Sequence, residues 1–493
     1  MLFEQLAKHA HAQADHIALL GQNSTLSYTE LYAAVHAART ILLDFAGQAT
    51  IALAVENSPT WVVLDLAAMA NANPTVPLPA FFSAAQMQHA VQDAGVSVLI
   101  TDNPAHYSNL FADFIQTSSH ITIAGKTLTA YKLNIPSKTL PADTAKITYT
   151  SGTTGHPKGV CLSAQAMLQV ANAIRIATQL NTLDQHLCVL PLATLLENVA
   201  GVYAALLAGA TVHLLPSEQV GLMGSKLDVS LLHAALLQNQ VTTAIFIPEM
   251  LQALVVACEN GADKLPHLRF LAVGGASVSP QLLQRALKLG LPIFEGYGLS
   301  ESASVVSLNT PQGNKIGSAG KPLPHVKVKI SDKNEVFVKG ANLLGYTGEQ
   351  ALTPAQDYID TGDIGYLDEE GYLFINGRKK NVFITSFGRN VSPEWVEREL
   401  KNSPHIAQAA LFGEAKPWNV AVIVPRQPAS NPVIQTTIDS INADLPDYAR
   451  IGRYIIADAP FSAQNQQLTT NGKNRRDMIL KNYQDKINAL YLY

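Results

Sequence analysis

Short apolar runs alternate with amphipathic stretches before about residue 300 of the chain. The apolar runs predict strands and the amphipathic stretches predict helices, so the alternation indicates βαβ units with parallel sheets covered by helices. The predicted strands outnumber those of one sheet of average size, so we expect two sheets. The predicted strands are residues 50–55, 96–101, 146–150, 185–190, 211–215, 243–247, 270–273 and 293–295, and the predicted helices include 28–43, 59–69, 84–94 and 279–289.

The pattern changes after Gly317, where short strands such as VKVKI and YLFING are separated by Gly and Pro turns. These strands indicate a small antiparallel or barrel-like subdomain. Charged residues then become frequent from Gly377 to Asn381, and a charged, non-apolar joint of this kind is typical of a domain boundary. The chain that follows has the size of one small domain, so we predict a large N-terminal part and a small C-terminal part.

Composition narrows the class of protein. The 493 residues are 47% hydrophobic with a formal net charge of -4, so the chain can bury enough apolar surface to fold and lacks the basic balance of a nucleic-acid binder. Cys161, Cys188 and Cys258 are an odd number of cysteines far apart in the sequence, which argues against a disulfide framework and for a reducing compartment. We therefore expect a cytoplasmic protein.

Two segments bear on contact with membranes. The N-terminal residues carry Glu4 and Asp15 where a signal peptide has an apolar run, so no secretory signal is predicted. Residues 198–217 lack Asp, Glu, Lys and Arg, but glycines and a proline interrupt them. They predict a buried helix through Leu207, a turn at Gly209 and a strand, rather than a membrane span. Peripheral contact with a membrane stays open.

The strongest chemical signal is the run YTSGTTGHPKG at residues 149–159, which directly follows the predicted strand KITYT. Its glycines let backbone amides approach an anion, its hydroxyls add donors and its lysine adds positive charge, so the run predicts a phosphate-binding loop. It is not a Walker A loop, because Pro157 and Gly159 stand where that pattern needs Gly and Ser or Thr. The predicted nucleotide contacts are Ser151, Gly152, Thr153, Thr154, Gly155 and Lys158.

With this loop, the sequence resembles the adenylate-forming superfamily of acyl-CoA synthetases, peptide-synthetase adenylation domains and luciferases. The superfamily's Tyr-Gly-x-Ser/Thr-Glu motif is matched by YGLSE at residues 297–301. The resemblance implies that the aromatic face stacks on a purine, that the hydroxyl binds a phosphate oxygen of ATP, and that the carboxylate holds Mg²⁺. The residues so implied are Tyr297, Gly298, Ser300 and Glu301, with Thr150 as a second magnesium ligand and catalytic residue.

Further matches follow in the order expected for the superfamily. GGA at residues 274–276 matches the adenine-side motif and implies contacts from Gly275 and Ala276. TGD at residues 361–363 matches the motif whose carboxylate accepts hydrogen bonds from both ribose hydroxyls. The implied residues beyond these are Asp363, Arg378 as a nucleotide contact and Lys380 at the hinge, followed by Asn381 where many relatives have Asp.

The match at the C-terminal end is TNGKNRR, residues 470–476. The resemblance implies that Lys473 is catalytic and stabilises negative charge as a carboxylate attacks the α-phosphate, because an ammonium aimed at the pentavalent centre stabilises the transition state. It also implies coenzyme A as co-substrate, with the thiol passing near Gly388.

The resemblance covers nearly the whole chain and implies an α/β fold. A large N-terminal domain of two α/β sheets plus a β-subdomain would span residues 1–378, followed by a hinge at 379–381. A small, mobile α+β domain would span 382–493. The two domains are expected to rotate between an adenylation pose and a thioester-forming pose, and so to share one active site.

The acid-binding stretch is expected at residues 190–198, LPLATLLEN. Amino-acid adenylation domains have an Asp here for the substrate's ammonium group, and this stretch has none, so an amino acid is disfavoured. The stretch is most similar to that of bacterial fatty acyl-CoA synthetases, with Thr194 in place of His and Leu196 in place of Phe. The second replacement removes the aromatic gate that many relatives have.

These residues predict a two-step ligase. A carboxylic acid, expected to be a fatty acid, and Mg·ATP would give acyl-AMP and pyrophosphate, and coenzyme A would then displace AMP. The nearer alternative is delivery of an acyl or aryl group to a carrier protein or another acceptor. The distant alternative is a non-catalytic nucleotide-binding protein on the same fold.

Overall fold

The computed structural model describes residues 2–150, 158–223, 226–276, 278–349, 358–387, 389–427, 431–469 and 472–492. The chain divides into two compact units. Unit 1 contains Met1–Ala276, Arg285–Val328 and Val338–Ile359, and unit 2 contains Ser277–Gln284, Lys329–Phe337 and Asp360–Tyr493. Each unit is described by itself.

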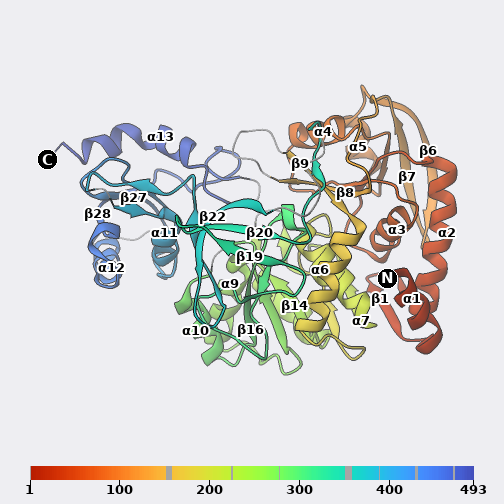
Figure 1. The fold of residues 1–493 in the computed structure, drawn as a ribbon, viewed down its shortest axis with the longest axis horizontal. Helices are drawn as coiled ribbons and strands as arrows, with labels where there is room; N and C mark the ends of the chain where they lie inside the picture. Colours follow the sequence, from red (N-terminus) through yellow and green to blue (C-terminus); the bar gives the residue numbers. More distant parts are fainter. Residues whose placement is uncertain are drawn as a thin grey trace. The chain divides into compact units, whose positions relative to one another are not determined.

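The first sheet of unit 1 has nine strands in the order β18-β17-β16-β15-β14-β10-β11-β1-β2. The strands from β16 to β1 in this order are parallel neighbours, whereas β2, β17 and β18 pair antiparallel at the two ends. The carboxyl ends of the parallel strands therefore share one edge of the sheet, seen in Figure 1. The strands are β1 (Ile17–Gly21), β2 (Thr25–Ser27), β10 (Gln185–Leu187), β11 (Thr211–Leu214), β14 (Thr243–Phe246), β15 (Phe270–Val273), β16 (Ile293–Tyr297), β17 (Ser307–Leu308) and β18 (Lys321–Pro322).

The second sheet of unit 1 has eight strands in the order β21-β9-β8-β4-β3-β5-β7-β6. Strands β8, β4, β3 and β5 are parallel, but β6 and β9 each close a direct hairpin, so the sides of the sheet are antiparallel. Two helix-covered sheets are thus confirmed; the prediction that they are parallel is confirmed for their central strands and wrong at their edges. The strands are β3 (Ile51–Ala54), β4 (Thr75–Pro77), β5 (Val98–Thr101), β6 (Ile115–Ile123), β7 (Lys126–Leu133), β8 (Thr144–Thr150), β9 (Lys158–Ser163) and β21 (Gly345–Tyr346).

The helices start where side chains can satisfy their first amides. Ser27 Oγ accepts from the Glu30 amide at 3.2 Å and Glu30 Oε2 accepts from the Ser27 amide at 2.8 Å, which fixes the start of α2. Helix α3 is buried almost all round, as expected for a helix without a polar face. The helices are α1 (Leu2–Ala12), α2 (Tyr28–Ala46), α3 (Pro59–Ala70), α4 (Ala84–Asp93), α5 (Pro104–Leu110), α6 (Ala164–Ala177), α7 (Ala204–Ala208), α8 (Val229–Gln238), α9 (Pro248–Glu259) and α10 (Pro280–Lys288).

The segment from Glu197, at the end of the predicted acid-binding stretch, into the uncharged residues 198–208 is helical and buried. It begins as a π-helix, η1 (Glu197–Tyr203), continues as α7 and ends at Gly209, whose φ of 78° is left-handed. Strand β11 then follows. The predicted helix, turn and strand are confirmed, whereas the π-helical geometry was not predicted. Short π-helical segments occur frequently at functional sites.

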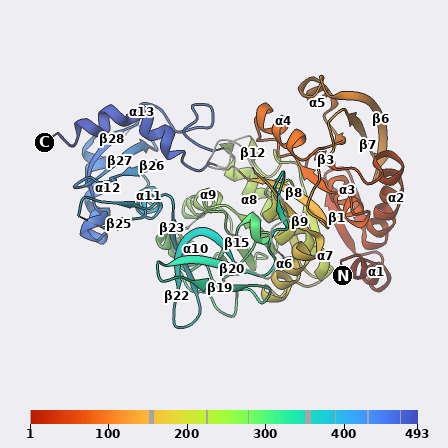
Figure 2. The ribbon, with the colours of Figure 1, turned by 45° about the horizontal axis from the view of Figure 1, so that its top comes forward.

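Unit 2 contains most of a four-stranded sheet, β19-β20-β22-β23, and a small α+β domain. The small domain has a three-stranded sheet with α13 on one face and α11 and α12 on the other (Figure 1 and Figure 2). The elements are β19 (Lys327–Ile330), β20 (Glu335–Lys339), β22 (Ile359–Leu367), β23 (Leu373–Arg378), β24 (Phe383–Ile384), β25 (Asn390–Val391), α11 (Pro393–Lys401), β26 (Ile406–Phe412), β27 (Asn419–Pro425), α12 (Asn431–Asp444), β28 (Ile451–Ile456) and α13 (Arg476–Ala489).

The period-two pattern of β27 explains why its sheet needs helices on both faces. Val420 and Val422 pack into the core beneath α13, whereas Ala421 and Ile423 pack into the core beneath α11 and α12. Successive side chains of a strand point to opposite faces, so a strand that is apolar at each position from Val420 to Val424 must be covered twice.

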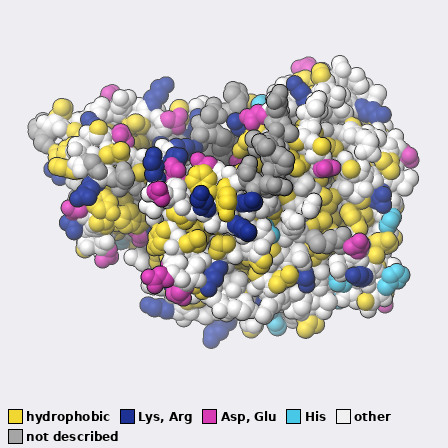
Figure 3. Space-filling view, in the orientation of Figure 1, with side chains coloured by type: hydrophobic (Ala, Val, Ile, Leu, Met, Phe, Trp, Pro, Cys, Tyr) yellow, Lys and Arg dark blue, Asp and Glu magenta, His cyan; other side chains and the backbone are white. Residues whose placement is uncertain are grey.

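Three features of the structure bear on the expectations from composition: the surface charges, the length of the apolar helices and the state of the cysteines. Lys and Arg side chains lie among Asp and Glu side chains on the face shown in Figure 3, rather than in a block of one sign. Across the described ranges, no helix has the length and apolar character needed to cross a bilayer. The cysteines Cys161, Cys188 and Cys258 are free.

Candidate active site

The predicted phosphate-binding loop connects two paired strands of unit 1. Strands β8 and β9 are antiparallel, and Thr150 pairs with Lys158 at the position where the loop leaves and re-enters the sheet. Tyr149 is anchored by its hydroxyl, which donates to Asp93 Oδ2 at 2.8 Å. The described residues thus fix both ends of the loop. The predicted contacts Ser151, Gly152, Thr153, Thr154 and Gly155, and the side chain of Thr150, lie outside the part of the chain that the structure describes.

Lys158 is the described cation at the end of this loop. Its Nζ lies 3.1 Å from Glu349 Oε1 and 5.0 Å from the ring centroid of Tyr346. The side chains of Lys158 and Glu349 are 55% and 47% exposed, so their ion pair is weak and screened by solvent. Lys158 can therefore exchange Glu349 for a phosphate oxygen at little cost.

Glu301 contacts the hydroxyl of Tyr346. Its carboxylate Oε1 accepts from the Tyr346 hydroxyl at 3.3 Å, and its backbone carbonyl accepts from the Leu343 amide at 2.7 Å. Burial and then the Glu301 charge raise the pKa of Tyr346, so the phenol stays protonated and donates. One tyrosine thus joins the predicted phosphate lysine to the predicted magnesium ligand. Tyr346 was missed because no motif marks it; only the pairing of β21 with β9 brings it to the site.

The turns that follow β15 and β16 lie next to each other, because these strands pair in parallel. Gly274 and Gly275 come directly after β15, and Gly275 has a φ of 83°. A Cβ on Gly298 would lie 1.6 Å from the Ser304 carbonyl oxygen, so only glycine fits there. Ser300 and Glu301 follow in a short 3-10 turn, Ser300–Ser302. Ligands of open α/β sheets bind outside the carboxyl ends of the strands, which is where these turns lie.

Apolar side chains border the same turns. A Cβ on Gly274 would lie 3.9 Å from Leu196 Cδ2, and a Cβ on Gly275 would lie 3.8 Å from Ile247 Cγ2. Leu196 is therefore beside the predicted adenine-side motif, as the sequence predicts for the acid-binding stretch. Thr194 is partly buried in the same stretch.

Two buried polar side chains hold the acid-binding stretch in place. Glu197 Oε2 accepts from the Leu190 amide at 2.9 Å. Asn57 Oδ1 accepts from the Leu192 amide at 2.8 Å, and its Nδ2 donates to the Leu190 carbonyl at 3.1 Å. These bonds give the stretch a defined conformation although it belongs to no sheet.

In unit 2, Asp363 and Arg378 are cross-strand neighbours on β22 and β23. Arg378 Nε lies 2.9 Å from Asp363 Oδ1, and Arg378 Nη1 donates to the Thr361 carbonyl at 3.0 Å. Asp363 is buried, whereas the side chain of Arg378 is 43% exposed and can reach a ligand. The arrangement can present one carboxylate to hydroxyl groups and one guanidinium to an anion.

Lys473 lies in the same electrostatic neighbourhood of unit 2. Burial among protein atoms lowers the pKa of Lys473, the charges of Arg378 and Lys380 lower it further, and those of Asp363 and Glu394 raise it. Solvent still reaches the side chain. The structure thus brings Lys473 near Asp363 and Arg378, although about a hundred residues separate them in sequence.

Glu394 is a second residue that sequence reasoning missed. Asn381 stands where many relatives have an Asp, and its Nδ2 donates to Glu394 Oε1. Helix α11 therefore supplies a carboxylate near the predicted hinge. The pKa of Lys380 is lowered by burial and by Arg378, and Glu394 opposes this. Gly388, predicted beside the thiol, lies outside the described ranges.

Comparison with known proteins identifies the family to which the chain belongs. The model of the family described as AMP-binding enzyme matches residues 6–349, and that of the AMP-binding enzyme C-terminal domain matches residues 380–492. The chain belongs to the AMP-binding enzyme family, and the predicted superfamily and α/β fold are confirmed.

Individual relatives span nearly the whole chain. It is 26% identical to a long-chain-fatty-acid–CoA ligase of Mycobacterium bovis, over 87% of this chain and 86% of the relative. It is also 26% identical to the 2-succinylbenzoate–CoA ligase of Bacillus subtilis, over 97% and 99%. Among solved structures, o-succinylbenzoate CoA synthetase of Bacillus subtilis with its acyl-adenylate is similar in fold, with a TM-score of 0.78, 24% identity and coverage of 96% and 97%.

Proposed function

We propose that this enzyme activates a carboxylic acid with ATP to acyl-AMP and pyrophosphate, and then transfers the acyl group to the thiol of coenzyme A. The observation that carries the proposal is the contact chain Lys158–Tyr346–Glu301 at the end of the phosphate-binding hairpin, in a chain of the AMP-binding enzyme family. A lysine over the ring of one tyrosine and a carboxylate at its hydroxyl suit a phosphate chain and its cation.

The other residues receive their proposed roles from the family motifs that they match. Tyr297, Gly275 and Ala276 would border the adenine, Ser300 a phosphate oxygen, and Asp363 and Arg378 the ribose and phosphates. Lys473 would stabilise the charge that develops as the acid attacks the α-phosphate. Lys380 would lie at the joint between the two domains, with the division at 379–381, and Gly388 near the thiol.

Magnesium fits the donors present. The Glu301 carboxylate is partly exposed, and the described partner of its oxygens is the neutral Tyr346 hydroxyl at 3.3 Å, which leaves lone pairs for a hard cation. Glu301, with Thr150, would hold the ion, which neutralises phosphate charge when bound.

We propose that the acid is apolar with a single carboxylate, and a fatty acid in the first instance. The side chains next to Gly274 and Gly275 are Leu196 and Ile247, and a second carboxylate or an ammonium group beside them would be desolvated without a partner. Relatives named as 2-succinylbenzoate–CoA and indoleacetate–CoA ligases make aryl acids the second class to examine.

A pyrophosphate-release screen tests this function. Fatty acids of several chain lengths, aryl acids and amino acids would each be offered with ATP and Mg²⁺, with coenzyme A, with a holo carrier protein, or without a thiol. We expect release with fatty acids and thioester formation with coenzyme A. Release that no acid stimulates would refute the function, preference for an amino acid would refute the pocket argument, and thioester on the carrier protein alone would reassign the acceptor.

A further inference from the structure

A lysine without an assigned role is buried in unit 1, where burial lowers the pKa of its side chain and Asp65 opposes this. Lys146 on β8 and Asp65 on α3 are 2% and 1% exposed, and Lys146 Nζ lies 2.8 Å from Asp65 Oδ1. The ring of Trp61, one turn earlier on α3, lies 5.6 Å from the same ammonium. Because an isolated buried charge costs several kcal/mol, such a lysine requires a complete set of partners.

The π-helix η1 completes that set. Lys146 donates to Asn198 Oδ1 and, at 3.0 Å, to the Tyr203 hydroxyl, and its ion pair with Asp65 Oδ1 supplies the third oxygen around the ammonium. Asp65 Oδ2 in turn accepts from the Tyr203 hydroxyl at 2.5 Å and from Asn198 Nδ2 at 3.2 Å. The four side chains form a closed network that joins α3, β8 and η1.

Glu197, the residue before Asn198, bonds the beginning of the acid-binding stretch. Glu197 is 0% exposed, and its Oε2 accepts from the Leu190 amide at 2.9 Å while Oε1 lies 2.9 Å from His186 Nε2. A Cβ on Gly201 would lie 2.3 Å from Glu197 Oε1 and 2.5 Å from His186 Nε2, so glycine makes room for the pair. Within the π-helix, Glu197 therefore bonds the beginning of the acid-binding stretch at Leu190, and the next residue, Asn198, belongs to the Lys146 network.

Strand β8 connects Lys146 to the predicted phosphate-binding loop. Lys146 precedes Thr150 on the same strand, and the predicted phosphate-binding loop starts immediately after Thr150. The carboxylate of the acid must lie in line with the α-phosphate to react, so the spacing between the two segments determines the rate.

We propose that Lys146, Asp65, Asn198 and Tyr203 are positioning residues, which hold the phosphate-binding strand and the acid-binding stretch at a fixed spacing through η1. This inference rests on the proposed adenylation reaction and adds to it a set of residues that position its two substrates. It predicts that loss of the network slows adenylation in correctly folded enzyme, while each substrate still binds its own segment.

The test is a pre-steady-state measurement of pyrophosphate release with the full chain, a fatty acid and no coenzyme A. The acyl-adenylate then stays on the enzyme, so the burst amplitude counts folded active sites and the burst rate reports the chemical step. The variants are Lys146→Met, which leaves Asp65 unpaired, and Lys146→Met with Asp65→Leu, which removes both charges and so restores much of the stability.

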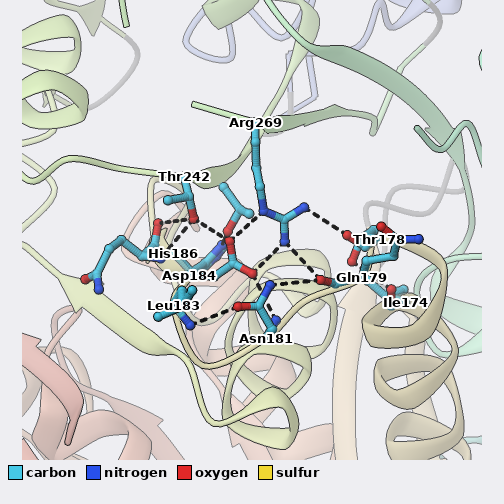
Figure 4. A network of polar contacts seen from close by, with 11 residues as sticks. Ile174, Thr178, Gln179, Asn181, Leu183, Asp184, His186, Thr242 and Arg269 are labelled. Carbon is cyan, nitrogen blue, oxygen red and sulfur yellow. Dashed lines mark hydrogen bonds and ion pairs between the residues drawn. The ribbon is translucent and has the colours of Figure 1, made fainter. Parts of the chain in front are cut away.

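A second ion pair of unit 1, between the buried Asp184 and the partly exposed Arg269, provides the control. Arg269 Nη2 lies 2.5 Å from Asp184 Oδ2 and its Nε lies 2.7 Å from Asp184 Oδ1, and its Nη1 donates to the Thr178 carbonyl at 3.0 Å. Figure 4 shows which groups are in contact. These residues precede β10 and β15, and so lie at the amino ends of the strands, away from the predicted substrates. Arg269→Met should lower stability and burst amplitude without slowing the burst.

We expect the Lys146→Met and Asp65→Leu double variant to keep the burst amplitude and to lose about tenfold or more in burst rate, with half-saturation by ATP changed less than threefold. A burst rate equal to that of wild type, or reduced no more than in Arg269→Met, would overturn the inference and leave only a structural role. Wild-type enzyme without an acid-dependent burst would instead refute the proposed function.

Discussion

At the scale of single residues, chemistry depends on neighbours that the sequence does not name. Lys473 and Asp363 were predicted from motifs, and the structure adds the charges of Arg378, Lys380 and Glu394 around the lysine. Tyr346 carries no motif, yet it contacts both Lys158 and Glu301. Residue types in a known order predict which chemistry is possible, whereas the partners that tune it come from folding.

Lys473→Ala should nearly abolish adenylate formation, by about a hundredfold to a thousandfold, because the charge on the pentavalent phosphorus loses its stabilising ammonium. Thioester formation from preformed acyl-AMP should be largely unaffected. Pyrophosphate release and the conversion of synthetic acyl-AMP are measured in parallel, with the exposed Lys481→Ala as control. Equal pyrophosphate release by wild type and the Lys473→Ala variant would show that Lys473 is not the catalytic lysine.

Tyr346→Phe should raise the Mg²⁺ concentration needed for half-maximal pyrophosphate release by a few-fold. The reason is that the Tyr346 hydroxyl, a neutral donor 3.3 Å from Glu301 Oε1, restricts the orientation of the carboxylate that is proposed to hold the ion. A magnesium titration at saturating ATP measures the midpoint. An unchanged midpoint would show that the tyrosine does not orient Glu301.

At the scale of elements, the carboxyl ends of parallel strands position the candidate site, and the turns that follow these strands border it. The parallel pairing of β14, β15 and β16 places Ile247, Gly274 and Tyr297 at one edge. Alternation of apolar runs predicts these strands well. It does not predict the antiparallel hairpin of β8 and β9 or the π-helix η1, because both depend on contacts with distant strands and buried charges rather than on local periodicity.

Two glycines at this edge should respond differently to alanine. Gly298→Ala should destabilise the protein or prevent folding, since its Cβ would lie 1.6 Å from a backbone oxygen that cannot move alone. Gly274→Ala should fold, since its nearest contact would be 3.5 Å, but should favour smaller acids by narrowing the space beside Leu196. Thermal unfolding and the acid screen check both. Normal unfolding of Gly298→Ala would contradict so close an approach of the Ser304 carbonyl.

At the scale of the whole molecule, buried neutral histidines connect stability to pH. Burial lowers the pKa of His213 to about 4, with the Asn239 side chain opposing this, and burial lowers the pKa of His325 to about 4. In the unfolded chain each titrates near 6.5, so between these values the unfolded state binds more protons. Each histidine therefore removes stability as the pH falls from about 6.5 to about 4.

The free energy of unfolding should fall over this window by up to about 1.4 kcal/mol per pH unit for each histidine. His213→Gln and His325→Gln should each flatten the slope, although either can lower stability at pH 7 through a lost hydrogen bond. Denaturant unfolding of full-length protein at several pH values measures the slope. A slope unchanged in both variants would show that these histidines titrate normally in the folded state.

The sequence by itself determined the family and the two helix-covered sheets, and it predicts most candidate site residues, because apolar periodicity and ordered motifs are local properties. Only the tertiary structure decided which side chains meet: Tyr346 between Lys158 and Glu301, Glu394 opposite Asn381, and Lys146 enclosed by Asp65, Asn198 and Tyr203. The physical reason is that a polar group leaves water only where its partners surround it, and those partners come from parts of the chain that folding alone brings together.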